Sequence, residues 1–274
     1  MIITTRKPAV SGHFYPSNKE QLEQEIKEYL SKKKENIKLA VSPHAGYMFS
    51  GKLAGDTLGK FENKKDFIIL GVNHPGLGCK ISTSQQDFET PLGIVKNNQD
   101  LGNKILKKLK EFGAGVNEQA HKQEHSIEVQ LPFLQLSQKR FEIIPILLKD
   151  LSFEDCKKIA EILSEFIDNN ISLIVSSDFT HYGENYNFIP FKKDIKKNLY
   201  SLDNEIIINI LNLNSKKVYE LTKASTVCGL YGITIATEVA KIKNMKAKLI
   251  EYYTSGDITG DFSNCVGYAG IVFS

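Results

Sequence analysis

Three apolar runs in the 274-residue chain each lead into a polar turn that carries a histidine. The runs span residues 39–44, 67–74 and 173–178, and they deliver His44, His74 and, just beyond Asp178, His181. Short runs rich in Ile and Val between helical patterns are typical of strands buried on both faces of a sheet. Ligands bind beyond the carboxyl ends of such strands. We therefore predict an α/β fold that brings several imidazoles to one sheet edge.

Length and composition predict one α/β domain covering residues 1–274, without internal repeats or linkers rich in Pro, Gly or Ser. The net charge of +3 is too small to indicate nucleic-acid binding. Residues 1–7 lack the apolar core of a signal peptide, and no apolar run approaches the ~20 residues that cross a bilayer. A cytoplasmic location is expected, in which the four cysteines are free or metal-bound rather than disulfide-paired.

The spacing of apolar residues also predicts several helices and further strands. Ser17 and Glu20 have the spacing of a capping box that opens a helix. Residues 121–134 have helical spacing, which would place Glu124 and Glu128 one turn apart on a shared face. Other helices are expected over 99–112, 153–167, two or three segments of 190–223, and 226–243. Strand-like pieces are expected between 80 and 96, over 141–148, and in two closing runs, 248–254 and 266–273.

Several imidazoles at one sheet edge favour a metal site, because neutral imidazole is the commonest metal ligand in proteins. Asp178 and His181 have the spacing of two ligands or of an acid/base pair, and Glu124 and His125 form a second candidate pair. Purely structural roles remain open for each of these residues, and are favoured for His13 and His121. Cys228 at a predicted helix start would gain thiolate character from the helix dipole.

Five motifs occur in an order that resembles the Memo family. They are Pro43-His44-Ala45-Gly46-Tyr47, Asn73-His74, Glu124-His125-Ser126-Ile127-Glu128 with Leu131-Pro132-Phe133, Ser176-Ser177-Asp178-Phe179-Thr180-His181-Tyr182-Gly183, and Val227-Cys228-Gly229. The resemblance extends over nearly the whole chain, from Gly12-His13-Phe14-Tyr15-Pro16 to the final strand. Because the motifs are separate and ordered, together they are more specific than any one of them.

The resemblance implies a single three-layer α/β/α domain similar to the class III extradiol ring-cleaving dioxygenases, the LigB-like fold. Carried over by position, it implies metal ligands at His44, His74 and Cys228. His125, Asp178 and His181 would line the same cleft as catalytic residues. Dioxygenases of this class use a carboxylate where Cys228 stands here, and a thiolate shifts metal preference towards copper, zinc or redox-active iron. Further implications are a small-molecule or peptide ligand, and association with radical-SAM and AMMECR-type proteins.

Three functions remain open from the sequence. The first is a metal-dependent oxidoreductase with iron or copper, or alternatively zinc, held by two histidines and one cysteine. The second is a hydrolase or transferase with Cys228 as nucleophile and a neighbouring histidine as base. The third is a protein that binds a peptide or small ligand in the same cleft without chemistry. Neither a nucleic-acid partner nor a membrane partner is expected.

Overall fold

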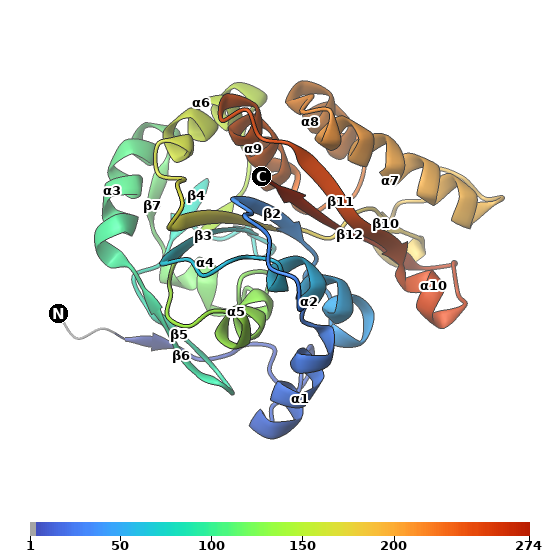
Figure 1. Cartoon of the computed structure of the whole chain (residues 1–274). Helices are drawn as coiled ribbons and strands as arrows, with labels where there is room; N and C mark the ends of the chain where they lie inside the picture. Colours follow the sequence, from blue (N-terminus) through green and yellow to red (C-terminus); the bar gives the residue numbers. More distant parts are fainter. Residues whose placement is uncertain (1–3) are drawn as a thin grey trace.

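The central strands are apolar at nearly every position, as strands buried on both faces require. In the computed structural model of the chain, which describes residues 4–274, they form the middle of a 12-stranded sheet. Four adjacent strands run parallel to one another: β8 (Glu142–Leu148), β3 (Asp66–Val72), β9 (Ile171–Ser176) and β2 (Leu39–Ser42). The prediction of an α/β fold with buried parallel strands is confirmed (Figure 1).

Shorter or antiparallel strands extend the sheet on both sides. Beyond β8 lie β6 (Gly93–Asn97), β5 (Asp87–Thr90) and β1 (Thr5–Arg6), while β4 (Ile81–Thr83) and β7 (Ala114–Val116) branch from β8. Beyond β2 lie β12 (Cys265–Phe273), β11 (Ala247–Thr254) and β10 (His181–Tyr182). The strands expected between residues 80 and 96 and at the end of the chain are therefore present.

Side chains of the central strands alternate between two hydrophobic clusters, one on each face of the sheet. Along β3, Ile68 and Leu70 enter one cluster, and Phe67 and Ile69 enter the other. The first cluster is covered by α3 (Gln99–Leu109), α6 (Phe153–Ser164), α7 (Ile195–Leu211), α8 (Ser215–Lys223) and α9 (Leu230–Ile242). The second is covered by α1 (Lys19–Tyr29), α2 (Lys52–Gly59), α4 (Glu118–Lys122) and α5 (Leu131–Ser137). Helices thus pack on both faces (Figure 1).

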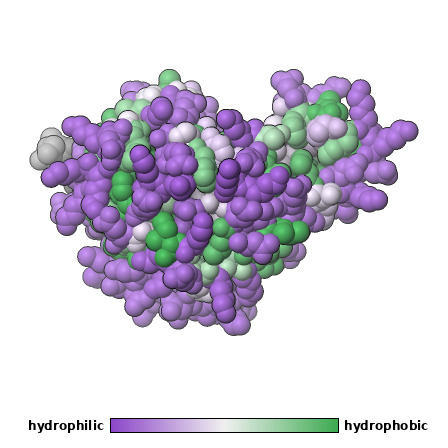
Figure 2. Space-filling model, turned by 90° about the horizontal axis from the view of Figure 1, so that it is seen from above, coloured by the Kyte–Doolittle hydropathy of each residue, from purple (hydrophilic) through white to green (hydrophobic). Residues whose placement is uncertain are grey.

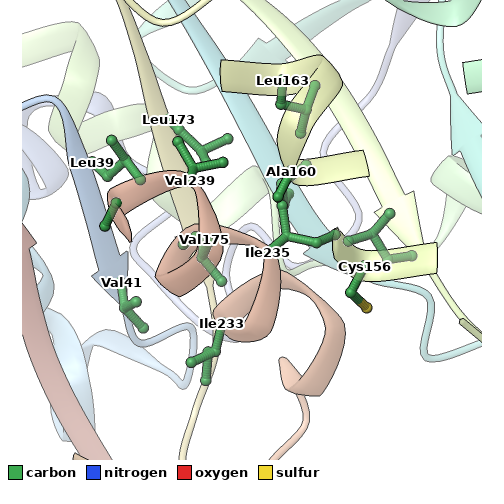
Figure 3. Packing of buried hydrophobic residues seen from close by; sticks show 14 of the residues in the cluster. Leu39, Val41, Cys156, Ala160, Leu163, Leu173, Val175, Ile233, Ile235 and Val239 are labelled. Atoms are coloured by element: carbon green, nitrogen blue, oxygen red, sulfur yellow. The ribbon is translucent and has the colours of Figure 1, made fainter. Parts of the chain in front are cut away.

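The helix α9 packs directly over the parallel strands. Ile233, Ile235 and Val239 meet Val175 and neighbouring strand residues in a contiguous buried cluster (Figure 3). The outer surface of this helical layer is predominantly hydrophilic, with small hydrophobic patches (Figure 2). Within the described residues, no helix is long and apolar enough to cross a membrane. The expectation that residues 1–7 do not form a signal peptide falls partly outside the described part of the chain, which begins at residue 4.

Two details of the predicted helices are wrong. The helix α1 is capped by Asn18, whose side chain accepts the Gln21 N–H at 2.9 Å, so Ser17 and Glu20 do not form the predicted capping box. A capping box does occur at α6, where Ser152 and Asp155 bond reciprocally. The second error concerns residues 121–134, which form no continuous helix. After α4 the chain runs irregularly through Glu124 to the short 3₁₀ helix Glu128–Gln130, and α5 follows.

Candidate metal centre

The parallel strands β3, β9 and β2 lie side by side and end at one edge of the sheet. His44 follows β2, His74 follows β3, and Asp178 follows β9. Cys228 lies in the turn before α9, whose N-terminal end is at the same edge, and its Sγ is 3.2 Å from Nε2 of His44. The structure therefore brings together the polar residues that the sequence placed after separate strands.

The hydrogen bonds around His44 determine which of its ring nitrogens carries the proton. Nδ1 of His44 lies 2.9 Å from Oγ of Ser176. That hydroxyl donates its single proton to the carbonyl of Ser126 at 2.6 Å and accepts from the Gln130 amide at 2.8 Å. Nδ1 must therefore be the protonated nitrogen, which leaves the lone pair on Nε2. Burial lowers the pKa of His44 to about 3, so the ring is neutral at pH 7.

His74 is oriented by the buried carboxylate of Glu124. Oε1 of Glu124 lies 2.9 Å from Nδ1 of His74, and the same carboxylate accepts the backbone N–H groups of His74 and Ser126, each at 2.8 Å. Burial acts to raise the pKa of Glu124, but the hydrogen bonds that the carboxylate accepts, that from the His74 side chain first, outweigh it and bring that pKa to about 2. The ionised carboxylate holds the proton on Nδ1, so Nε2 is again the free nitrogen.

Cys228 places its sulfur atom beside Nε2 of His44. Its Sγ accepts the backbone N–H of Asp178 at 3.2 Å and lies 3.8 Å from the hydroxyl of Ser177. Since Nε2 of His44 carries no proton, the thiol donates to it across the 3.2 Å separation. Burial and the nearby Asp178 raise the pKa of the Cys228 thiol. The predicted thiolate character from the helix dipole is therefore wrong for the free thiol, because Cys228 is desolvated and precedes the N-cap, Gly229.

The structure brings three possible ligand atoms within 4.8 Å of one another, one each from His44, His74 and Cys228. Two ligands bound to one ion at roughly 2.0–2.3 Å are separated by roughly 3–4 Å. The spacing of these atoms therefore suits a single metal ion after small side-chain adjustments. His74, Glu124 and His125 form a second group with the same upper spacing, but Glu124 is already bonded to Nδ1 of His74.

The other three predicted site residues line a cleft of about 630 Å³ that reaches His44 and His74. The ring of His125 stacks on His74 at a centroid distance of 4.7 Å, and burial lowers the pKa of His125 to about 4. Asp178 is buried and accepts the backbone N–H of His44 at 2.7 Å, and burial raises its pKa.

His181 is oriented by two backbone carbonyls. Its Nδ1 lies 3.0 Å from the carbonyl of Phe179 and 3.1 Å from that of Thr226. Because carbonyl oxygens only accept, Nδ1 carries the proton and Nε2 is the basic nitrogen. The ring of Tyr186 packs edge-on against His181 at 5.0 Å. These contacts fix the orientation of His181 at the wall of the cleft.

Comparison with known proteins identifies the family. A sequence model described as Memo-like protein matches residues 6–272. The chain belongs to the Memo family. MEMO1 family proteins of Methanosarcina mazei and Pyrococcus furiosus are each 36% identical over 97% of this chain and 98% of their own length. That of Aquifex aeolicus is 37% identical over 98% of both chains. The resemblance inferred from the ordered motifs is confirmed.

In this Memo family protein, the segment that holds Glu124 and His125 is fixed by a distant residue. Arg6 of β1 donates to the carbonyls of His121 and Glu124 at 2.6 Å each and pairs with Glu128 at 2.8 Å. Glu128 also accepts from the hydroxyl of Tyr15 at 2.6 Å. Arg6 thus occupies the carbonyls of His121 and Glu124, which would accept backbone N–H groups in a continuous helix. The Glu124 carboxylate bonds to His74 and that of Glu128 to Arg6, so the two side chains do not share a helix face. This is why the predicted continuous helix is absent.

Sequence reasoning missed part of the cleft wall. His13 and Phe14 line the cleft, although a structural role was favoured for His13, and the ring of Phe14 packs against His125 at 4.9 Å. The Gly12-to-Pro16 motif was the available signal for these two residues. His121 is buried and its Nε2 donates to the carbonyl of Ser82 at 2.9 Å, which agrees with the structural role favoured for it. The four cysteines are unpaired, as expected.

Proposed function

We propose that this Memo family protein is an oxidoreductase that holds one iron or copper ion with Nε2 of His44, Nε2 of His74 and Sγ of Cys228. The observation that carries the proposal is the convergence of two imidazole lone pairs and one thiol. Both histidines have Nδ1 occupied by an acceptor, Ser176 for one and Glu124 for the other. Such partners orient metal-binding histidines and increase their basicity.

The donor set supports iron or copper, with zinc as a further possibility. Imidazole suits iron, copper and zinc, and thiolate favours soft or redox-active ions over magnesium or calcium. A metal ion that binds here displaces the proton shared by Sγ of Cys228 and Nε2 of His44. Because a proton is released, the affinity for the metal rises with pH. We also propose that the fold is that of the class III extradiol dioxygenases, with Cys228 in place of their carboxylate ligand. Helices on both faces of the sheet and a site at its carboxyl edge support this relationship.

Bound iron or copper would supply one-electron transfer to or from a substrate in the cleft. The side chains around the site would move the accompanying protons. His181 accepts a proton at Nε2, because its Nδ1 proton is held by the Phe179 and Thr226 carbonyls. Asp178, whose pKa is raised by burial, holds and releases a proton beside His44. His125 stacks on His74 and limits access of water to that side.

The test follows the oxidation state of the bound ion directly. Protein loaded with iron(II) or copper(I) is mixed with air-saturated buffer and then with ascorbate, and visible absorption from thiolate-to-metal charge transfer is recorded. We expect a band that appears on oxidation, disappears on reduction, and is absent in Cys228→Ser. Asp178→Asn should slow the cycle by about 10²-fold if Asp178 moves a proton. An ion that binds but never changes oxidation state would contradict the proposal.

One observation favours a second function, a hydrolase with Cys228 as nucleophile. Sγ of Cys228 lies 3.2 Å from Nε2 of His44, whose Nδ1 is oriented by Ser176, and this is the arrangement of a nucleophile, its base and an orienting group. Protein stripped of metal by a chelator is assayed with 4-nitrophenyl acetate. Hydrolysis that is lost in Cys228→Ser and blocked by iodoacetamide would support this second function. Activity that requires metal would reject it.

A further inference from the structure

One buried carboxylate outside the candidate metal centre has no positively charged partner. Asp203 of α7 is fully buried, and within residues 4–274 no ion pair includes it. Burial raises the pKa of Asp203 to about 6, against the effect of its hydrogen bonds, so the group is mainly ionised at pH 7. Burying an unpaired charge is costly, and carboxyl groups perturbed in this way cluster at functional sites. The partners of Asp203 therefore indicate what its charge does.

All hydrogen bonds of this carboxylate come from neutral donors on neighbouring elements. Oδ1 accepts the hydroxyl of Thr180 at 2.5 Å, and Oδ2 accepts the hydroxyl of Tyr252 on β11 at 2.7 Å. The strand β12 leaves room for the carboxylate, because a Cβ at Gly267 would lie 2.3 Å from Oδ2. The backbone of Gly267 also bonds to Phe179 at 2.8 Å and to Thr180 at 3.0 Å. The elements α7, β11 and β12 thus hold the carboxylate against the segment that follows β9, at the side of the sheet where α7 packs (Figure 1).

The peptide group between Phe179 and Thr180 connects this carboxylate to His181. Its nitrogen lies 3.3 and 3.4 Å from the two oxygens of Asp203, and its N–H donates to them. Its carbonyl oxygen, on Phe179, lies 3.0 Å from Nδ1 of His181. Because a peptide group is planar, holding its N–H also sets the direction of its carbonyl. An N–H bonded to a carboxylate polarises the carbonyl, which strengthens the bond from the ring.

Asp203 acts on the closer of the two acceptors of the His181 ring. The second acceptor, the carbonyl of Thr226, lies 3.1 Å from the same Nδ1. The hydroxyl of Thr226 also accepts the backbone N–H of His181 and donates to its carbonyl, so the main chain of His181 is held separately. The contribution of Asp203 is therefore the direction of the Phe179 carbonyl, on which the position of the ring proton depends.

We propose that Asp203 is a positioning residue for His181, and that its carboxylate keeps the ring proton on Nδ1 by orienting the Phe179–Thr180 peptide group. Nε2 of His181 thereby keeps its lone pair at the wall of the cleft. Asp203 is not among the described residues that line the cleft, so it acts only through this peptide group. The inference rests on the proposed function in one respect, because there His181 is the proton acceptor. The orientation of the ring requires no metal and is tested separately.

The tautomer of His181 is measured by long-range nitrogen–proton NMR spectra of the full-length protein at about pH 9, where imidazole rings are neutral. Metal is first removed with a chelator, so the measurement does not depend on metal binding. The chain has six histidines, and the signal of His181 is the one absent in His181→Gln. The test variants are Asp203→Ala, which removes the acceptor, and Thr180→Val, which removes one donor. Tyr252→Phe is the matched control, because it removes a bond to the same carboxylate on the side away from Thr180.

We expect a single tautomer protonated at Nδ1 in the wild type and in Tyr252→Phe. Asp203→Ala should give a mixture of tautomers, and Thr180→Val should give a smaller shift in the same direction. Thr180→Val decides the test if Asp203→Ala does not fold. An unchanged His181 signal in either folded test variant would overturn the inference. An equal shift in Tyr252→Phe, or a wild-type ring protonated at Nε2, would also overturn it.

The redox cycle of metal-loaded protein separates this inference from the proposed function. If both hold, the folded test variants cycle about tenfold more slowly than the wild type, and Tyr252→Phe does not. Mixed tautomers in variants of a protein that takes up no metal would support the inference and contradict the proposed function. A working redox cycle with His181 tautomers that ignore Asp203 would leave the proposed function standing and remove the inference.

Discussion

Three histidines at the candidate metal centre and its cleft wall each have their Nδ1 proton held by a different kind of acceptor. For His44 the acceptor is the hydroxyl of Ser176, for His74 it is the carboxylate of Glu124, and for His181 it is a pair of backbone carbonyls. In every case the consequence is the same, because the lone pair is left on Nε2. The tautomers of these rings are therefore a property of the residues behind them.

Substituting Ser176→Ala tests this dependence. The variant removes the acceptor of Nδ1 of His44, so we expect metal affinity to fall about 10–100-fold. Affinity is measured by competition with a chromophoric chelator. Ser172→Ala is the matched control, since Ser172 is buried on the same strand and its hydroxyl has no hydrogen-bond partner. Equal affinities in the two variants would show that Ser176 does not orient the ligand.

For single residues, the sequence motifs predicted the candidate metal ligands that the structure brings together, but not the residues that orient them. His44 and His74 follow recognisable strands, and Cys228 was placed by the family resemblance. Glu124 was expected to pair with His125, and Nδ1 of His125 does lie 3.6 Å from its Oε1. Its shorter contact, at 2.9 Å, is to Nδ1 of His74, fifty positions away in the chain, which was not expected. Gln130, which is fully buried and donates to Ser176, had no sequence signal. Such partners are fixed by the tertiary path of the chain, which spacing does not reveal.

Among the secondary-structure elements, α9 determines where the sulfur lies. The helix begins beside β9 because glycine allows close approach, since a Cβ at Gly229 would lie 2.2 Å from Cβ of Ser177. One turn later, a Cβ at Gly232 would lie 2.7 Å from Cγ1 of Val175. The two glycines therefore allow α9 to sit close enough for Cys228 to reach His44.

Gly229→Ala is expected to lower the free energy of unfolding by about 1–3 kcal/mol, because the added methyl group overlaps the chain at Ser177. Urea denaturation measures the change. Gly102→Ala on α3 is the control, since its Cβ would make only an ordinary contact, 3.8 Å from Ile144. That variant should be neutral or more stable by up to about 1 kcal/mol, owing to helix propensity. A destabilisation no larger than that of the control would contradict this account of α9.

Periodicity predicted the strands and most helices of the described chain well. It was misleading for residues 121–134, where apolar positions recur at helical spacing but the backbone is held by Arg6 and Glu128. The apolar side chains of this stretch, such as Ile127 and Leu131, are buried as their pattern indicated. The apolar pattern therefore predicts which side chains of residues 121–134 are buried. It does not predict their backbone conformation, which depends on Arg6, more than 100 positions away.

Over the whole molecule, the cleft is assembled from segments that no local pattern connects. Its lining combines Phe14 near one end of the chain, His125 and His181 from the middle, and Asp261 and Tyr268 near the other end. The edge of the sheet could be predicted because parallel strands end together. The aromatic walls of the cleft could not be predicted, since they depend on how the short helix α10 (Ser255–Thr259) and the N-terminal segment fold over that edge.

The stability of the whole molecule should depend on pH through its buried neutral histidines. Burial lowers the pKa of His121 to about 4, below the ordinary 6.5, so the unfolded chain binds more protons between these values. Stability therefore rises with pH across this window and falls as the protein is acidified, by up to about 1.4 kcal/mol per pH unit for this residue. Urea denaturation of wild type and His121→Gln at pH 5, 6 and 7 should show a shallower dependence in the variant. Identical slopes would contradict this assignment.

The central claim is that His44, His74 and Cys228 hold one redox-active ion. The most direct measurement is metal content by mass spectrometry on protein purified without added metal, with His74→Ala and Cys228→Ser beside the wild type. We predict near-stoichiometric iron or copper in the wild type and its loss in both variants, with each variant still folded by circular dichroism. Little metal in all three proteins, even after reconstitution with iron(II) and copper(I), would contradict the claim.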